Sequence, residues 1–497
     1  MKNSWKWYKD KILCIFLLIT LVFFGAFIKI NYTTDTYAVI EGLHRAILGN
    51  FLQSGRFITA IFFAIFVKLH VSIKVAYVVS YIVAIFAITL SIYKTYNLIK
   101  NEILSDNEKK NILVILISIL LIINPFSIEL MIYIEKGIMA LSILFSICAV
   151  EKFVAYLKEE NKKDKIKNIA ISALYILLAV SSYQGTVGIF VVFSAIFILK
   201  YSKTFCKFVK NTILNLLVYG IPALINLIFT KFIFKGSRVS GERIIPESIK
   251  KIIDGSKSMV NAYGILPKYS FLIFIDLALI FTIIIIMNNK NKILNLLKLI
   301  YVILITYFIA IAPQAMQATS SIWMVARSTY TFASIIVLIQ ILAMLINEKE
   351  YKNKVLINLM IVFDFIFIIV EMVSFNEIEV QNYQISFEDK QIALRLEQKL
   401  EEYEKETGIK VNKIAFYEDK SKSWTYRDIT KNFGDVNLTA FATDWSDANM
   451  INYYTGRNLT KVEKDEEIEK SYKDKDFITF SDEEILIKGD TVHFCKF

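Results

Sequence analysis

Five side chains that could carry acid–base or phosphate chemistry follow the first apolar run of the chain. Asp35 comes a few residues after that run, and the segment beyond it is too polar to cross a bilayer. This segment holds the other four: Glu41, His44, Arg45 and Arg56. A carboxylate can act as a general base, and guanidinium groups can bind phosphate. The cluster suits an enzyme acting on an anionic, lipid-linked substrate, although an interfacial connector with solvated charges would carry the same residues.

A second group of ionisable residues falls at the ends of later apolar runs. Glu129 follows Asn124-Pro125, and Glu135-Lys136 stand at the start of the next run. Ionisable side chains at a membrane are costly to bury without a role or a partner, so Glu129 is a candidate for substrate binding. For Glu135 and Lys136, a local ion pair or a lysine that reaches out to the interface explains the sequence equally well.

Two polar loops add candidates for sugar and phosphate binding. Tyr183 and Gln184 lie in a short turn that ends at Gly185, between two half-length apolar runs. Such interrupted runs often open onto a cavity, where these side chains could bind sugar hydroxyls, although a tight turn also explains the glycine. Gln314 and Arg327 flank a later loop. An arginine at the start of an apolar run can hold a phosphate through two hydrogen bonds, or it can anchor a helix among lipid headgroups.

The composition places these residues in a polytopic membrane protein. The chain has 497 residues, 55% of them hydrophobic, with 38 Phe and 26 Tyr. Apolar runs of roughly 17–25 residues recur, the length that a helix needs to cross about 30 Å of hydrocarbon. Much of the positive charge lies in short lysine-rich loops, where topology explains the net charge of +11 better than nucleic-acid binding does. The four cysteines are scattered, and we expect no disulfide framework or zinc site.

About eleven helical crossings are predicted from these runs. The expected spans are Ile12–Ile30, Ile73–Tyr96, Ile112–Ile123, Gly137–Val154, Ile169–Ser182, Thr186–Leu199, Val209–Phe234, Tyr269–Met287, Ile293–Ala312, Val325–Ile346 and Val355–Ser374.

Charge fixes the expected topology. A lysine-rich N-terminus stays in the cytoplasm, so residues 31–72 form the first external loop. The apolar segment Phe57–Leu69 would be roughly 20 Å long as a helix, which is too short to cross. The loops Glu151–Lys167 and Lys200–Lys210, with six and four lysines, are cytoplasmic only if it does not cross. We predict a re-entrant or interfacial helix there. The external basic loop Gly236–Lys268 is either solvated or a patch for anions.

The chain changes character near residue 375. Residues 1–374 form the predicted membrane domain, and residues 375–497 a small extracytoplasmic α/β domain. Gly408 and Gly456 are placed to end its helices, and Gly489-Asp490 to join its last two strands. The expected elements are helices Phe387–Glu406 and Asp444–Tyr454, and strands Lys413–Tyr417, Phe477–Phe480, Glu484–Lys488 and Thr491–Lys496.

The order of the polar motifs resembles a family of membrane glycosyltransferases. Asp35-Thr36-Tyr37, then Gly42 and Gln53-Ser54-Gly55-Arg56, are similar to the opening of the Gtr-type II glucosyltransferases of the GT-C superfamily. Ser182-Tyr183-Gln184 is similar to a second feature of that family. Asn124-Pro125 and Arg327 match more loosely, and the resemblance ends near Ser374. One departure matters: Thr34 stands where many members have a second acid, which argues against a two-carboxylate scheme or a paired metal site.

The resemblance implies a GT-C-like helical enzyme of the plasma membrane, with its N-terminus in the cytoplasm. It would move a hexose, with glucose expected, by inversion from a polyprenyl-phosphate donor to a cell-surface glycan outside the cell. The acceptor could be teichoic acid, O-antigen-type or other wall polysaccharide, or a glycolipid. Membrane lipid, a donor synthase and a flippase are the expected partners, and nucleic acid is not. No cofactor is implied with certainty, and a divalent cation stays open.

The same resemblance distributes roles among the candidates. Asp35 would be the general base, with Glu41 beside it as a second catalytic acid or orienting group. The residues expected to bind sugar, acceptor or phosphate are His44, Arg45, Arg56, Glu129, Tyr183, Gln184, Gln314 and Arg327.

A transporter or flippase of lipid-linked saccharides, or another non-catalytic part of a polysaccharide export system, is the alternative. It would favour polar residues facing each other at mid-membrane, and Asp276, Asp364 and Glu371 are the few candidates there. No GxxxxGK[ST] loop supports an ATP-driven pump.

Overall fold

The computed structural model describes residues 2–41, 43–103, 108–260, 269–347, 354–419, 436–477 and 481–496. They fall into two compact units. The first lies within Met1–Lys29 and Ile47–Asn376, and the second within Ile30–Ala46, Glu377–Lys431 and Val436–Phe497. The segment that carries Asp35 therefore groups with the C-terminal region rather than with the helices that flank it in sequence.

The first unit is helical throughout its described residues. Its long helices are α1 (Lys2–Phe24), α4 (Phe57–Lys68), α5 (Ile73–Ile103), α6 (Glu108–Ile122), α8 (Lys136–Lys158), α9 (Lys162–Ser182), α10 (Gly188–Tyr201), α11 (Phe205–Ile228), α13 (Ile245–Ser258), α14 (Ser270–Met287), α15 (Lys292–Ala315), α17 (Ile335–Ile346) and the first part of α18 (Lys354–Thr407). Its short helical turns are η1 (Gly25–Ile28), η2 (Ile47–Phe51), η3 (Pro125–Ser127), α7 (Ile128–Ile132), η4 (Gln184–Thr186), η5 (Phe229–Ile233), α12 (Ser237–Ser240), η6 (Thr319–Ser321), η7 (Ala326–Ser328) and α16 (Tyr330–Ala333).

Among the described residues, nine helices are long and apolar enough to cross a membrane. A tenth crossing would be the bent pair Asn111–Ile122 and Pro125–Ile132, with an angle of 41° between the two. The chain is therefore a multi-pass α-helical membrane protein. The structure does not confirm the eleventh crossing expected at Val325–Ile346, where only α17, of 12 residues, is a continuous apolar helix.

Side-chain hydrogen bonds explain the irregular start of that segment. The Ser328 and Thr329 hydroxyls donate to the carbonyl oxygen of Val325 at 3.0 and 2.9 Å. Serine and threonine that bond the nearby backbone in this way compete with a regular helix. The predicted span therefore becomes η7, α16 and the short α17.

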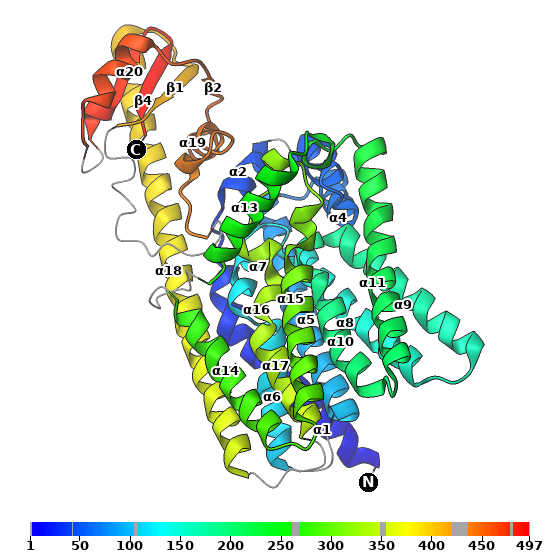
Figure 1. Cartoon of the computed structure of the whole chain (residues 1–497). Coiled ribbons are helices and arrows are strands. Elements are labelled where there is room, and N and C mark those ends of the chain that lie inside the picture. The colour runs from blue at the N-terminus through cyan, green and yellow to red at the C-terminus, as the bar shows by residue number, and fades with distance from the viewer. Residues whose placement is uncertain are drawn as a thin grey trace. The chain divides into compact units, whose positions relative to one another are not determined.

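The helices of the first unit pack around two buried elements. Every residue of α10 from Gly188 to Ile198 is buried, and α17 is buried from Ile335 to Met344. In Figure 1, α10 and α15 run side by side within this unit. By contrast, α11 exposes Ile213, and Ile221 on the same helix is 53% exposed. Exposed apolar surface of this kind is compatible with lipid contact, since lipid tails are as apolar as these side chains.

One predicted helix forms as expected, and another is longer than expected. The short apolar segment Phe57–Leu69 forms α4, which is 12 residues long, and its re-entrant or interfacial placement stays a prediction. Helix α18 runs without a break for 54 residues, so the predicted span Val355–Ser374 and the predicted helix Phe387–Glu406 are one element. No glycine or proline interrupts α18, and these are the residues that most often end a helix.

The second unit contains a small α/β fold. Strands β1 and β4 pair in parallel from Lys413↔Thr491 to Tyr417↔Cys495, β2 pairs in parallel with the other edge of β1, and β3 and β4 form an antiparallel hairpin. The sheet order is β2-β1-β4-β3. Its elements are α2 (Thr34–Glu41), α3 (Leu43–Ala46), the rest of α18, β1 (Lys413–Tyr417), η9 (Ala440–Ala442), α19 (Asp447–Thr455), β2 (Thr460–Lys461), α20 (Glu466–Lys473), η10 (Asp482–Glu484), β3 (Ile485–Lys488) and β4 (Thr491–Cys495).

Most predicted elements of the tail are confirmed, with small changes. Strand β1 has the predicted bounds, and Gly456 ends α19 with a positive φ of 73°. The prediction that Asp444 begins this helix was wrong, because α19 starts at Asp447. The expected strand Phe477–Phe480 falls mostly outside the described residues.

Candidate functional site

The turn Gln53-Ser54-Gly55-Arg56 is held in place by polar side chains from two other elements. Gln184 of η4 donates to the Ser54 carbonyl oxygen at 2.9 Å, and Asn226 of α11 donates to that of Gly55 at 2.8 Å. Gly55 has φ of +72°, and a Cβ there would lie 2.5 Å from Asn226 Oδ1 and 2.6 Å from Thr230 Oγ1. Only glycine meets both demands. The close approach fixes the start of α4 and therefore the position of Arg56.

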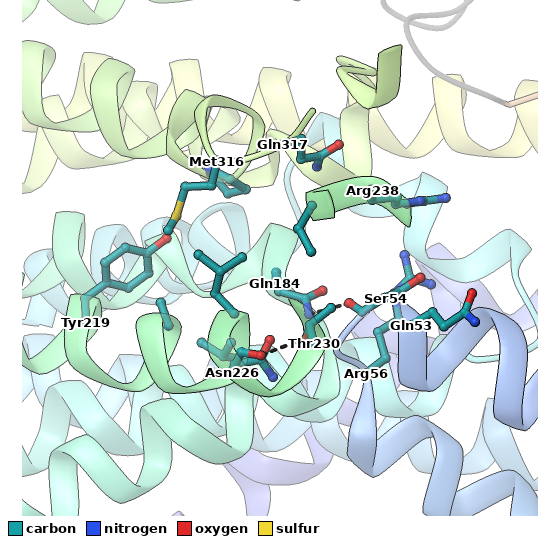
Figure 2. Close-up of a pocket in the computed structure, with 15 residues that line it drawn as sticks. Gln53, Ser54, Arg56, Gln184, Tyr219, Asn226, Thr230, Arg238, Met316 and Gln317 are labelled. Carbon is teal, nitrogen blue, oxygen red and sulfur yellow. Dashed lines mark hydrogen bonds between the residues drawn. The ribbon is translucent and has the colours of Figure 1, made fainter. Parts of the chain in front are cut away.

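A pocket with about 760 Å³ of empty space, part of it open to the surface, adjoins this turn and has both polar and apolar walls. In Figure 2, Met316 and Gln317 lie on the side opposite Asn226 and Thr230, with Gln184 between them. The lining residues are Gln53, Ser54, Arg56, Val180, Gln184, Tyr219, Ala223, Asn226, Leu227, Thr230, Arg238, Val239, Pro313, Met316 and Gln317.

An irregular stretch of α11 supplies two of these polar side chains. Pro222 lies inside the helix, and the helix then changes into the π-helical turn η5. Proline removes a backbone hydrogen bond, and π-helical turns often occur at functional sites. The Thr230 hydroxyl donates to the Asn226 carbonyl oxygen at 2.7 Å, so both residues belong to this distorted stretch. Asn226 faces the pocket as a buried amide.

Arg56 joins the pocket to a buried ion pair. Its Nη1 donates to Glu135 Oε1 at 3.1 Å, with side-chain exposures of 15% and 6%. The guanidinium also lies 4.8 Å from the centre of the buried Tyr183 ring, a cation–π contact. Glu135 therefore forms its ion pair across the fold with Arg56. The local pair with Lys136, one of the explanations that the sequence allowed, is not the contact that the structure shows.

Arg327 forms a second buried pair nearby. Its Nη1 donates to Glu129 Oε1 at 2.6 Å, its backbone N–H donates to the other oxygen, and its guanidinium lies 4.5 Å from the centre of the Tyr133 ring. Glu129 is fully buried. Both pairs act electrostatically on Tyr183, which places them around one side chain.

Close backbone packing brings these two turns together. A Cβ at Gly185 would lie 2.3 Å from the Arg327 carbonyl oxygen and 2.9 Å from Ser328 Cα. The glycine thus permits η4 and η7 to touch, and the contact sets Tyr183 beside Arg327.

Lys136 adds a third cation to this cluster. Its side chain is fully buried, and its Nζ lies 3.7 Å from the centre of the Tyr77 ring. Among the residues that the structure describes, its ammonium has no hydrogen-bond partner. The cluster therefore combines two arginine–glutamate ion pairs with the buried Lys136 side chain. Buried polar groups normally have a partner, and the Tyr77 ring supplies a cation–π contact here.

The sequence of this unit also matches a known family. A sequence model described as glucosyl transferase GtrII matches residues 23–346, well over half of the chain. The chain belongs to the GtrII glucosyl transferase family. No curated protein matches it. The GtrII match confirms the resemblance drawn from the polar motifs and makes the chain a membrane glycosyltransferase. It includes the pocket and all five charged residues of the cluster, and it ends before α18.

The other predicted residues of this GtrII protein lie in the second unit. Asp35 is in the first turn of α2, partly exposed, and its Oδ1 accepts a hydrogen bond from the Trp445 indole at 3.3 Å. His44 and Arg45 of α3 are exposed. The side chain of Glu41 is outside the described part, as is Gly42 of the family motif.

Within the first unit, the predicted residues have different surroundings. Arg56 and Gln184 line the pocket, whereas Glu129, Tyr183 and Arg327 belong to the ion-paired cluster. Gln314 is buried and accepts the Trp323 backbone N–H at 3.1 Å, so it holds the loop after α15.

Sequence reasoning missed several residues of this site. Asn226, Thr230, Tyr219 and Arg238 line the pocket without having been singled out. An asparagine inside an apolar run was the available signal for Asn226, because a buried amide at that depth needs a partner.

Proposed function

We propose that this glycosyltransferase moves glucose from a polyprenyl-phosphate donor to a surface glycan, acting on the extracytoplasmic side of the membrane. The observation that carries the proposal is the cluster of two ion pairs and the buried Lys136, joined through Arg56 to the pocket that this arginine lines. A glycosyl phosphodiester brings one negative charge beside a sugar, and the leaving lipid phosphate gains more as it departs. A preorganised set of cations stabilises that developing charge.

In this proposal, Arg56 lies where the phosphate and the sugar of the donor meet. It lines the pocket and forms an ion pair in the cluster, while its buried Nε has no hydrogen-bond partner among the described residues. The free N–H can donate to a phosphate oxygen without breaking the pair with Glu135. Lys136 would add charge from the buried side.

The pocket offers acceptor atoms for sugar hydroxyls. The Gln184 and Asn226 amide nitrogens are used by backbone carbonyl groups, which leaves their side-chain oxygens without a donor among the described residues. Glucose hydroxyls are such donors. Amides that are already fixed by one hydrogen bond lose little further freedom when they bind a second group.

In the proposed mechanism, Asp35 is the general base, an assignment that rests on the family resemblance. It takes the proton of the acceptor hydroxyl as that oxygen attacks C1 of the glucose. The new C1–O bond forms on the face opposite the phosphate, the C1–O(phosphate) bond breaks, and polyprenyl phosphate leaves with the electron pair. The configuration at C1 is inverted, as expected of a GT-C enzyme. A positioned base contributes roughly 10²- to 10⁴-fold to the rate.

The proposal is tested with the full chain in proteoliposomes, given polyprenyl-phosphate [¹⁴C]glucose and surface polysaccharide from cells that lack the gene. Wild type should label the polysaccharide, and Asp35→Asn should reduce labelling by at least about 10²-fold while the protein stays folded. Arg56→Gln should raise the KM for the donor and lower kcat. Lys250→Gln, which removes an exposed charge of the same unit, should leave both unchanged.

Two results would contradict the proposal. Full labelling by Asp35→Asn would exclude the carboxylate as base. Movement of the intact glucosyl lipid across the bilayer by wild type, with no label in the polysaccharide, would favour a flippase instead.

A further inference from the structure

Trp445 lies between η9 and α19 in the second unit and presents its ring to solvent. Its side chain is 55% exposed, while the next two residues, Ser446 and Asp447, are fully buried. The indole Nε1–H donates to Asp35 Oδ1 at 3.3 Å. A large apolar ring is thus held in solvent with one edge against a carboxylate.

The backbone on both sides of Trp445 is fixed by buried polar contacts. Before it, the Asp389 carboxylate accepts a hydrogen bond from Thr439 Oγ1 at 2.7 Å. After it, Asp447 binds the Lys496 ammonium at 2.9 Å. The position of the ring is therefore set by its neighbours, as in a binding surface that is organised before its ligand arrives.

Asp35 is held equally firmly. Helix α2 packs on α19 through the Tyr37 and Tyr454 hydroxyls, which are 3.1 Å apart. Just before α2, the Tyr32 ring makes an edge-on contact with the Tyr453 ring of α19. The carboxylate and the indole consequently keep one relative geometry within this unit.

We infer that Trp445 and Asp35 form a binding subsite for one pyranose ring of the acceptor glycan. The inference rests on the proposed function, in which Asp35 takes the proton of the acceptor hydroxyl. A pyranose has an apolar face of C–H groups and a rim of hydroxyls. The apolar face packs on the indole, which offers a large rigid surface, and a rim hydroxyl donates to Asp35 Oδ2. Among the described residues, no group donates a hydrogen bond to that oxygen.

A lipid surface is the other ligand that an exposed tryptophan can meet, because tryptophan is enriched at membrane interfaces. The geometry favours the sugar. At an interface the indole N–H typically bonds a headgroup or water, whereas here it is paired with Asp35. The same carboxylate would be repelled by anionic headgroups.

The subsite lies partly outside the family match. Asp35 is within residues 23–346, but Trp445 is not. The base would thus come from the shared part of the family, and the platform that selects the acceptor sugar from the part of this chain that the match does not include.

The experiment uses the full chain in detergent and oligosaccharides cut from the polysaccharide of cells that lack the gene. Saturation-transfer NMR without donor measures binding, and the transfer assay measures KM and kcat. The variants are Trp445→Ala, Trp445→Phe and Asp35→Asn. Phe387→Ala is the matched control, because this ring of the same unit is 51% exposed and lies on α18.

Trp445→Ala should lose the NMR signal and raise the KM for the oligosaccharide at least about ten-fold. Tryptophan rings that a ligand covers contribute much of the binding energy at many interfaces. Trp445→Phe should recover part of the binding, and the KM for the donor should not move. Phe387→Ala should behave as wild type.

The two hypotheses fail in different ways. If wild type binds the oligosaccharide through Trp445 but transfers no glucose, the proposed function is wrong and the subsite stands. If transfer proceeds and Trp445→Ala keeps the wild-type KM and NMR signal, the subsite is overturned. Quenching of indole fluorescence by brominated lipid in proteoliposomes that is lost in Trp445→Ala, with KM unchanged, would assign the ring to lipid.

Discussion

The ion-paired cluster of the first unit and the Asp35–Trp445 surface of the second hold their charges in opposite ways. In the cluster, Glu129 and Lys136 are fully buried, and aromatic rings cover the cations. At the surface, the carboxylate is partly exposed and one aromatic edge touches it. Removing one partner of a buried ion pair is strongly destabilising, whereas exposed charges interact weakly and are accessible to a ligand. Under the proposed function, the buried cluster would hold the anionic donor and the exposed surface would exchange acceptor glycans.

The largest effect should come from breaking a buried pair. Arg327→Ala leaves Glu129 charged and buried without its guanidinium, which costs about 3–5 kcal/mol. We expect a large drop in thermal stability in detergent and no measurable glucose transfer. Asp35→Asn, at the exposed surface, should lose transfer with little change in stability. If the two variants unfold at the same temperature, the contrast between the regions is wrong.

The next largest effect comes from two glycine substitutions, whose comparison separates the cost of backbone strain from the cost of a steric clash. Gly55 and Gly408 have φ of +72° and +73°, but only Gly55 has neighbours within 4 Å of a built Cβ. Gly408→Ala should cost about 1–2 kcal/mol, the usual penalty of a left-handed residue. Gly55→Ala should cost more and should also raise the KM for the donor, because Arg56 moves with the turn. Thermal unfolding and transfer kinetics are measured for both variants. Equal losses of stability would show that the close approach of Asn226 and Thr230 to Gly55 adds nothing to the cost.

A third change should move stability and activity in opposite directions. Lys136→Met replaces a buried ammonium that lacks a hydrogen-bond partner by an apolar side chain of similar length. Stability should stay level or rise, since well-packed apolar groups often replace buried charge without cost. The KM for the donor should rise by about ten-fold if the cation contacts phosphate. A stable variant with unchanged donor KM would remove Lys136 from the site.

The smallest effect on glucose transfer is expected from a group in the tail, Glu484, whose titration changes the stability of the tail with pH. Burial raises the pKa of Glu484 to about 8. The folded tail then keeps a proton that the unfolded chain loses near its usual pKa of about 4.3. Stability should therefore fall as pH rises from about 4.5 to 8, by at most about 1.4 kcal/mol per unit.

Hydrogen exchange of β3 and β4 amides, corrected for intrinsic rates, measures this slope. Glu484→Gln should flatten it and leave glucose transfer at constant pH close to wild type. An unchanged slope in that variant would show that another group titrates.

Local patterns were enough to predict much of the fold. The bounds of β1 follow from a short apolar run after Lys413, and the helices follow from apolar length, because each depends on neighbouring residues only. The unbroken α18 is not predicted, because the polar residues in its centre resemble the start of a soluble domain, although none of them ends a helix.

The candidate site was less predictable, because its contacts join distant residues. Arg56 and Glu135 were each conspicuous, but nothing in the sequence between them indicates that they pair. The same holds for Asp35, whose indole partner lies in the tail. Residue types pointed to the chemistry, while partners depended on tertiary packing.

The contact at Gly185 limits how this protein can vary. The space that a single methyl group would need is already filled by the Arg327 carbonyl and by Ser328 Cα. Those neighbours are backbone atoms, so no change of their side chains can make room. Pocket walls such as Met316 and Gln317 line open space and can change one residue at a time. The junction of η4 and η7 cannot, and any descendant that keeps this packing is confined to glycine there.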